Sequence, residues 1–510
     1  MSPLRDLAEQ STRITKAKSM NRREFLKTAG LAVGGLTASQ FVPRLGMAAA
    51  NPRQLTIDTR TLEVNGKAAT VYGLTESGKP GLTFAPGERF SVALTNSLKE
   101  ETIIHWHGLT PPYEQDGVAD NPLPMLKAGE TRHYDFALEE AGTLWMHAHT
   151  LQEQNLLAAP LIVRSKEDLS ADRQEVVILL HDFSFKPAEE LLAALNGGKG
   201  GHMMHGGHGM DMSSMGKMSM QHDMTSMGSG QTMSGKHDMS AMGGMGAMDL
   251  NDIEYDAYLA NDRTLDDPDV VKVEKGGRVR LRIINGAAST AFHLATGKLS
   301  ATLVAVDGHP IAPITSDTFP MTMAQRIDLD IDIPKDGGAF PILALREGTG
   351  DRTGLVLATT GAKIERLAGK IEAKAPPLDL TLEAALRSAT PLSERRTDKA
   401  VMAHLTGDMA SYQWALEGLE DLKLKTGERV EIAMMNMSMM AHPMHLHGHA
   451  FQVVDIDGKR FSGATRDTVL VPPMKTVTIA FDAGRPGNWP FHCHHLYHMV
   501  TGMMTHIEIA

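Results

Sequence analysis

The sequence predicts an all-β protein of three related domains, each a Greek-key β-barrel, with a flexible insertion in the second. Three observations lead to this prediction: a turn-and-strand pattern occurs three times, short runs of alternating apolar residues fill the intervals, and helical periodicity is scarce. The chain has 510 residues, of which 42% are hydrophobic, so it is long enough to bury three separate cores.

The repeated pattern begins at Gly87, Gly276 and Gly427. Each glycine precedes an arginine by two positions and an asparagine by nine, and alternating apolar residues lie between them. The glycine indicates a turn, and the alternation indicates a strand. We expect further strands at residues 175–180, 326–333 and 476–481, and the clearest helices at residues 188–195 and 380–386. Composition changes near residues 166 and 370 place the domains at residues 51–166, 167–370 and 371–510.

The first 50 residues have the pattern of an export signal. Arg22 and Arg23 precede a mildly apolar stretch and then the small residues Ala48, Ala49 and Ala50. This resembles a twin-arginine (Tat) signal, with Asn21 where Ser or Thr is usual. We therefore expect the Tat export machinery as a partner and the periplasm as the location. The alternative is a basic N-terminal tail with a short core helix.

Charge and cysteine content exclude several classes of partner. The net charge is −11 and no run of Lys and Arg occurs after the signal, which argues against nucleic acid and anionic membrane surfaces. No later stretch approaches the ~20 apolar residues of a membrane span, so we expect no membrane partner for the mature form, and a monomer. Cys493 is the only cysteine, so its thiol is either simply buried or held by a ligand.

Four histidine motifs predict metal sites: His105-Trp106-His107, His147-Ala148-His149, His442 with His445 and His447, and His492-Cys493-His494 with His498 and Met503. In a strand, residues two apart share a face, so each His-x-His pair presents two imidazoles to one side. Imidazole suits copper, zinc, iron or nickel, so the pairs alone do not name the metal. Two histidines, one cysteine and a distant methionine form the ligand set of a blue-copper site, and His442, His498, Cys493 and Met503 complete it.

In order and spacing, these motifs resemble those of the multicopper oxidases, the family of laccases, ascorbate oxidase and bacterial cuprous oxidases, whose domains are cupredoxin-like. The resemblance implies one-electron oxidation of a substrate coupled to four-electron reduction of O2 to water. It implies four copper ions per chain. Type 1 copper would bind His442, Cys493, His498 and Met503; type 2 would bind His105 and His445; and the binuclear type 3 pair would bind His107, His147, His149, His447, His492 and His494. The first and third domains would supply every ligand, with the second as a spacer.

Asp116 follows His107 by nine residues and matches a carboxylate that the family places near its oxygen-reducing copper cluster. Met499 stands where many bacterial members have an acidic residue directly after the last type 1 histidine. We expect Asp116 to serve the oxygen site as a catalytic residue and another proton route to replace the missing acid.

Residues 197–249 form the predicted insertion. Fourteen methionines and five histidines lie in residues 197–248, among mostly Gly, Ser, Asp and Lys, and such sequence cannot fold alone. Thioethers prefer Cu(I), which makes Cu(I) the expected substrate and labile Cu(I) a further ligand of the chain. The candidate Cu(I) ligands are Met440, beside His442, and Met210, Met212, Met215, Met239, Met242, Met245 and Met248.

Other interpretations stay open. The insertion could be an inert linker, and Met440 could be a core residue of a strand. The reductant could be a phenol or another small organic donor, as in laccases, or the protein could be a non-enzymatic periplasmic copper store. The store leaves the ordered set of ligands unexplained. We expect core or surface roles for the remaining histidines, His133, His181, His293, His309, His404, His449, His495 and His506.

Overall fold

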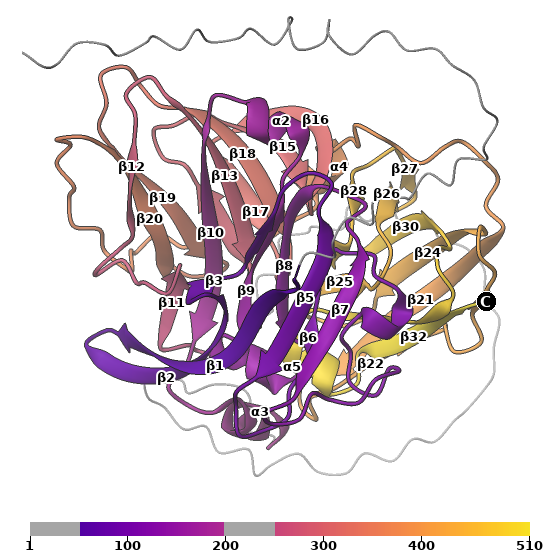
Figure 1. The fold of residues 1–510 in the computed structure, drawn as a ribbon. Helices are drawn as coiled ribbons and strands as arrows, with labels where there is room; N and C mark the ends of the chain where they lie inside the picture. The colour runs from indigo at the N-terminus through magenta and orange to yellow at the C-terminus, as the bar shows by residue number, and fades with distance from the viewer. Residues whose placement is uncertain (1–50, 198–249) are drawn as a thin grey trace, which may run out of the picture. The chain divides into compact units, whose positions relative to one another are not determined.

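The computed structural model describes residues 51–197 and 250–510 (Figure 1). The expected export signal and the candidate Cu(I) ligands between Met210 and Met248 lie outside these residues. The described residues from Pro52 onward belong to one compact unit. Three pairs of β-sheets follow one another along it, so the predicted all-β class and the three-domain organisation are confirmed. The boundaries near residues 166 and 370 stay predictions.

The first pair contains sheets with the strand orders β3-β2-β1-β5-β7 and β4-β9-β8-β6. Aromatic side chains such as Phe84, Phe90 and Trp106 fill the core between them. Its strands are β1 (Arg53–Val64), β2 (Lys67–Glu76), β3 (Lys79–Pro80), β4 (Leu82–Phe84), β5 (Arg89–Asn96), β6 (Ile104–His105), β7 (Thr131–Ala137), β8 (Gly142–Ala148) and β9 (Ala158–Val163).

The second pair has the orders β11-β10-β13-β18-β15-β16 and β12-β20-β19-β14-β17. Phe292, Phe319 and Ile342 lie in its core. Its strands are β10 (Gln174–Phe183), β11 (Ala257–Ala260), β12 (Val270–Val273), β13 (Arg278–Asn285), β14 (Phe292–Ala295), β15 (Ala301–Val306), β16 (His309–Ser316), β17 (Thr318–Met321), β18 (Arg326–Asp332), β19 (Ala339–Arg346) and β20 (Arg352–Thr359).

The third pair has the orders β22-β21-β24-β30-β26-β27, with β28 beside β26, and β23-β32-β31-β25-β29. Cys493 and Met503 belong to its core. Its strands are β21 (Lys399–Asp408), β22 (Gln413–Glu417), β23 (Lys423–Leu424), β24 (Arg429–Asn436), β25 (His442–Leu446), β26 (Phe451–Ile456), β27 (Lys459–Arg460), β28 (Thr465–Arg466), β29 (Thr468–Val471), β30 (Thr476–Asp482), β31 (Gly487–Cys493) and β32 (Met504–Ile509).

The threefold pattern in the sequence corresponds to one strand in each pair of sheets. β5, β13 and β24 each run from the repeated arginine to the repeated asparagine, and each pairs in parallel with an earlier strand, β1, β10 or β21. Gly87, Gly276 and Gly427 precede them with φ values of 83°, 68° and 88°. Glycine enters this left-handed region without steric cost, which explains its place at each turn.

The repeated asparagines fix the loops that lead to the histidine motifs. Asn436 is buried, and its Nδ2 donates to the carbonyl oxygens of Met440 (2.7 Å) and Val471 (2.9 Å). Asn96 holds the Glu100 carbonyl in the same way, at 2.8 Å. Because a buried amide must find partners, each asparagine fixes the path of the chain just before β6 or β25.

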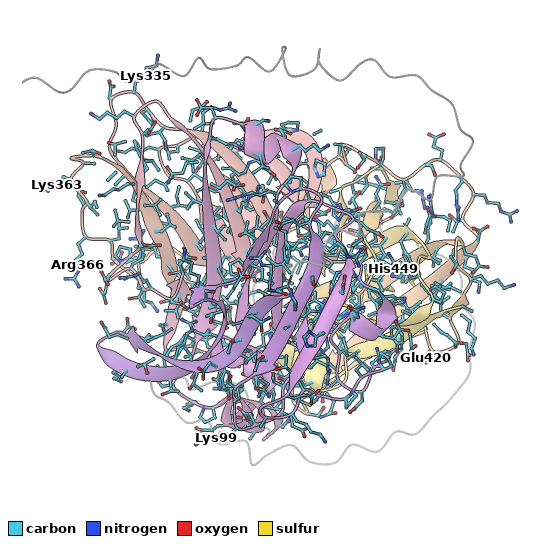
Figure 2. All side chains as sticks on the ribbon, in the orientation of Figure 1. Lys99, Lys335, Lys363, Arg366, Glu420 and His449 are labelled. Carbon is cyan, nitrogen blue, oxygen red and sulfur yellow. The ribbon has the colours of Figure 1, made fainter. Side chains whose placement is uncertain are left out.

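Helices are few and short: α2 (Lys166–Ser170), α3 (Ala188–Asn196), α4 (Thr381–Ala385), α5 (Leu496–Val500) and the 3₁₀ turns η1 (Tyr113–Gln115) and η2 (Leu151–Asn155). The helices expected at residues 188–195 and 380–386 are confirmed as α3 and α4. None of the described helices has the length and apolar character needed to cross a membrane. Charged side chains such as Lys335, Lys363 and Glu420 project outward, whereas His449 lies inside (Figure 2).

Candidate metal centres

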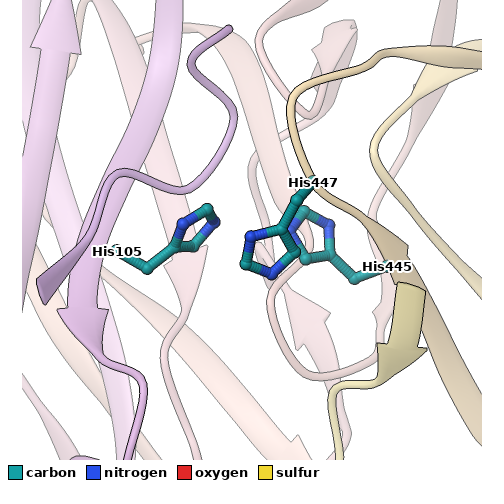
Figure 3. A group of neighbouring side chains, drawn as sticks. All are labelled: His105, His445 and His447. Atoms are coloured by element: carbon teal, nitrogen blue, oxygen red, sulfur yellow. The ribbon is translucent and has the colours of Figure 1, made fainter. Parts of the chain in front are cut away.

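Eight histidines from the first and third pairs of sheets meet in one buried cluster. His105 ends β6 and pairs in register with His147 of β8, and His445 of β25 pairs with His492 of β31. Each of these four histidines is followed two positions later by another, and these are His107, His149, His447 and His494. Figure 3 shows His105 on the first pair of sheets facing His445 and His447 on the third. All eight are less than 9% exposed.

The ring nitrogens of this cluster face one another. Nε2 of His492 lies 2.9 Å from Nε2 of His447 and 3.3 Å from Nε2 of His149. Nε2 of His147 lies 3.4 Å from Nε2 of His494. Three further nitrogens, His105 Nε2, His445 Nε2 and His107 Nδ1, are buried without a hydrogen-bond partner among the described residues.

These nitrogens fit metal ions. Burial lowers the pKa of His492 to about 4 and lowers the pKa of His147 and His447 well below 6.5, so the rings are neutral at pH 7. On each of the three, Nδ1 faces an oxygen acceptor: the Cys493 carbonyl, Glu153 Oε2 or Asp116 Oδ2. Their Nε2 atoms therefore carry lone pairs that face lone pairs, and a cation between them removes the repulsion.

Two aspartates orient four of the histidines in the same way. The backbone oxygen of Asp116 accepts from His105 Nδ1 (2.9 Å), and its Oδ2 accepts from His447 Nδ1 (2.7 Å). The backbone oxygen of Asp467 accepts from His445 Nδ1 (2.8 Å), and its Oδ1 accepts from His107 Nε2 (3.0 Å).

Of these two aspartates, only Asp116 is predictable from the sequence. Asp467 lies 360 residues from His107 along the chain, in no motif that marks it. The second pair of sheets also takes part, because Arg326 of β18 binds Asp467.

The second cluster lies in the third pair of sheets. Cys493 Sγ is 3.7 Å from His442 Nδ1 and 3.8 Å from His498 Nδ1, and these two nitrogens are 3.2 Å apart. Met503 is fully buried in the same core, and its backbone N–H donates to the His498 carbonyl. Burial raises the pKa of the Cys493 thiol, so a cation here has to displace the proton. The structure thus brings together the four residues expected at a blue-copper site.

The two clusters are joined through covalent bonds. Cys493 is the last residue of β31, and its neighbours His492 and His494 both reach into the eight-histidine cluster. The side chains of a strand alternate between faces, so one strand end serves both clusters. An electron arriving at Cys493 has a route of few bonds to either histidine.

Residues that the sequence analysis did not assign cover the second cluster. Asp252 is fully buried, and its Oδ2 accepts from Tyr412 Oη and from His498 Nε2 (3.0 Å). The His495 ring stacks on the His498 ring with 3.7 Å between centroids and 9° between planes. His495 was expected to have an ordinary core or surface role, and the only sequence signal against that is its position next to His494.

Comparison with known proteins identifies the family of the chain. Sequence models described as multicopper oxidase match residues 57–168, 175–367 and 394–510. The chain is 32% identical over 450 residues to multicopper oxidase MmcO of Mycobacterium tuberculosis, covering 86% of this chain and 82% of the relative. It is 26% identical to copper resistance protein A of Escherichia coli, covering 96% and 99%. It is 23% identical to laccase-2 of Botryotinia fuckeliana, covering 88% and 80%.

Solved structures share the fold. Fet3p, a multicopper oxidase that functions in iron import, superposes with a TM-score of 0.69 at 18% identity, covering 89% of this chain and 90% of Fet3p. A laccase-like multicopper oxidase from Ochrobactrum gives a TM-score of 0.65 at 18% identity, covering 91% and 98%. With its three cupredoxin-like domains and its two histidine clusters, the chain belongs to the multicopper oxidase family, copper-dependent oxidoreductases that use dioxygen as electron acceptor.

Proposed function

We propose that this protein is a cuprous oxidase of copper tolerance, which oxidises Cu(I) to Cu(II) and reduces O2 to water. It works as a monomer in the periplasm after Tat export, and it holds four copper ions. Bound copper supplies one-electron redox steps and a place for dioxygen. The observation that carries Cu(I) as the substrate is a sulfur-lined cavity beside the second cluster.

The residues that would hold the four coppers follow from the geometry above. His442, Cys493, His498 and Met503 would bind type 1 copper. His105 and His445, with their unpartnered Nε2 atoms, would bind type 2 copper. The six remaining histidines would bind the type 3 pair, with His107, His147 and His494 on one side and His149, His447 and His492 on the other.

The cavity measures about 190 Å³, and Met323, Met439, Met440, Glu347 and His495 lie in its wall. Thioethers are soft donors that prefer Cu(I) to Cu(II), and a carboxylate balances the charge of the ion. Met440 is only 6% exposed and lies in the loop between β24 and β25, so it is a residue of the third core but not of a strand. Sulfur, imidazole and carboxylate in one small cavity make a site suited to Cu(I).

The cavity adjoins the proposed type 1 ligands through one ring contact and one short chain segment. His495 stacks on the His498 ring, and Met440 precedes His442 by two residues. An electron that leaves Cu(I) here therefore reaches His498 or His442 through packed side chains. Asp252 and Tyr412 cover the other edge of His498, which disfavours bulky organic donors at that edge.

The test compares two neighbouring methionines. Met440→Leu keeps the buried volume but removes the thioether, so kcat/KM for Cu(I) should fall about tenfold or more. Met437→Leu is the matched control, because Met437 lies in the same loop, is 57% exposed and is not part of the cavity wall. Oxygen uptake with Cu(I) and with an outer-sphere one-electron donor separates substrate binding from the oxidase itself. Equal Cu(I) kinetics in both variants and the wild type would remove the cavity from the mechanism.

Deletion of residues 197–248 tests the candidate ligands Met210, Met212, Met215, Met239, Met242, Met245 and Met248. We expect a higher KM for Cu(I), because the thioethers would gather labile Cu(I).

A laccase-like role is the second candidate, since laccases are among the relatives. Rapid oxidation of phenols without any oxidation of Cu(I) would favour the laccase-like role. The absence of oxygen uptake with every reductant would favour a copper store.

We also propose that Asp116 serves the oxygen site as a proton-handling group. One of its oxygens, Oδ2, binds His447, while Oδ1 is buried without a hydrogen-bond partner among the described residues. Asp116→Asn retains the size and the backbone contact to His105, so copper should still bind while oxygen reduction slows about 10²-fold or more. An unchanged rate of oxygen reduction in a fully copper-loaded variant would contradict this role.

A further inference from the structure

Asp116 and Asp467 have the same relation to the histidines but different surroundings. Each offers its backbone oxygen to one histidine of the proposed type 2 site and a carboxylate oxygen to one of the proposed type 3 pair. Asp116 has no arginine partner in the described chain, whereas both carboxylate oxygens of Asp467 bind the Arg326 guanidinium. The arginine partner therefore suits the Asp467 carboxylate to holding ligands in place, whereas the Asp116 carboxylate is proposed to handle protons.

Arg326 comes from β18, in the second pair of sheets, and it is fully buried. Its Nη1 donates to Asp467 Oδ1 at 2.7 Å, and its Nη2 donates to Asp467 Oδ2. The remaining donors bind backbone oxygens of Thr143 (3.2 Å), Ala324 (3.1 Å) and Asp307 (3.1 Å). These acceptors belong to β8, to the turn before β18 and to the turn before β16, so the guanidinium is held on every side.

We propose that Arg326 is a positioning residue of the oxygen-reducing centre, which fixes Asp467 so that Asp467 can orient His107 and His445 together. The proposal rests on the copper ligands assigned above. His107 and His445 stack with 3.8 Å between ring centroids and 16° between planes, and one belongs to each of the two copper types. A shift of Asp467 thus moves ligands of both. The second domain, expected as a spacer, would thus also hold the metal centre in place through Arg326.

Charge explains why an arginine is needed. Removing one partner of a buried ion pair leaves a charge unpaired, and a planar guanidinium can fix a carboxylate at both oxygens, which an ammonium cannot. The Asp467 carboxylate also accepts from Thr468 Oγ1 at 3.0 Å. With Arg326, His107 and Thr468 all donating, the carboxylate is held in one orientation.

The experiment uses copper-loaded, full-length protein with three variants and one control. Arg326→Met removes both the positive charge and the two parallel hydrogen bonds to Asp467, and Arg326→Lys retains the charge alone. Asp467→Asn keeps the backbone oxygen that accepts from His445. Arg282→Met is the control, because Arg282 is equally buried, binds Asp328 and Glu175, and makes no contact with Asp467. Copper content, the EPR spectrum of type 2 copper and the blue absorption of type 1 copper are measured for each.

We expect Arg326→Met to weaken copper binding at the eight-histidine cluster by about 10–100-fold and to change the type 2 EPR spectrum, while the blue absorption remains. Arg326→Lys should restore part of the affinity. Asp467→Asn should disturb the His107 side more than type 2 copper, and it carries the test if Arg326→Met does not fold. Wild-type copper content and EPR in the Arg326 variants, or the same losses in Arg282→Met, would overturn the proposal. Wild-type protein that binds no copper would instead refute the proposed ligands.

Discussion

Glu347 is a buried residue of the cavity wall whose charge changes near neutral pH. Its side chain lies in the wall of the sulfur-lined cavity, and burial raises its pKa from 4.5 to about 7. Its Oε1 accepts the backbone N–H of Leu378 at 2.5 Å, which favours the charged form and offsets part of the burial. The carboxyl is therefore neutral in the cavity below pH 7 and charged above it.

The KM for Cu(I) should consequently fall as pH rises through about 7, because the carboxylate then attracts the cation. Glu347→Gln should flatten this pH dependence. The same variant should be more stable than wild type above pH 7, since the folded-state pKa is raised and wild type loses stability as pH rises from 4.5 to about 7. Steady-state kinetics and urea unfolding from pH 5 to 9 measure both effects, with Glu372→Gln as an exposed control. A KM that varies with pH equally in both variants would exclude Glu347 from the site.

At this scale the sequence identified the side chains of the two clusters but not the groups that orient them. His-x-His pairs around a single cysteine are recognisable from spacing alone, and the structure brings all of these residues together. Asp252 and His498 are 246 positions apart, and Asp467 and His107 are 360 apart. Contacts of that kind arise from the packing of domains, and no local pattern reports them.

Among the elements, the turn between η1 and the following loop shows how backbone shape places a functional group. Gly117 follows Asp116 with φ of 88°, and a Cβ atom there would lie 1.9 Å from the Ile104 carbonyl oxygen. Only glycine allows the Asp116 backbone oxygen to approach His105 closely. The requirement comes from contact with β6 as well as from the left-handed backbone.

Gly117→Ala should therefore lower stability and weaken copper binding at the eight-histidine cluster. Gly87→Ala is the matched control, because its φ is 83° and a Cβ there has nothing within 4 Å. The free energy of unfolding of the control should fall by about 1–2 kcal/mol because of the left-handed backbone alone, and that of Gly117→Ala should fall by more. Urea unfolding of the copper-free proteins and copper content of the loaded ones give the comparison. Equal losses would show that the contact with Ile104 has no role.

Repeated turns and alternating residues predicted a strand at each of β5, β13 and β24, because these signals are local. α5, which carries His498, was not among the expected helices, since five residues give too little periodicity to recognise a helix. The pairing of β25 with β31, which brings His445 beside His492, was not predictable in the same way.

Across the whole molecule, the metal centres form where three pairs of sheets meet. The first and third pairs supply the eight-histidine cluster, the second supplies Arg326 from β18, and the chain segment before β11 supplies Asp252. Without metal, the buried imidazoles of the two clusters make the stability of the fold sensitive to acid. Burial lowers the pKa of His492 to about 4 and lowers that of His442 and His447 well below 6.5.

Copper-free protein should therefore lose stability as pH falls below 6.5 toward 4. The folded-state pKa values are depressed, so the unfolded chain binds protons first on acidification. Copper-loaded protein should resist to lower pH, because metal-bound nitrogens cannot take a proton until the ion leaves. Urea midpoints between pH 8 and 4, with and without copper, measure the difference. Parallel curves for the two forms would contradict copper binding at these histidines.

The most direct test of the central claim is oxygen uptake by purified, copper-loaded protein on addition of Cu(I), with absorption and EPR spectra of the same sample. We predict an intense blue thiolate-to-copper band, type 1 and type 2 EPR signals, and four Cu(I) ions oxidised for each O2 consumed. A blue protein that consumes oxygen with phenols but not with Cu(I) would contradict the proposed substrate, and a colourless protein would contradict type 1 copper at Cys493.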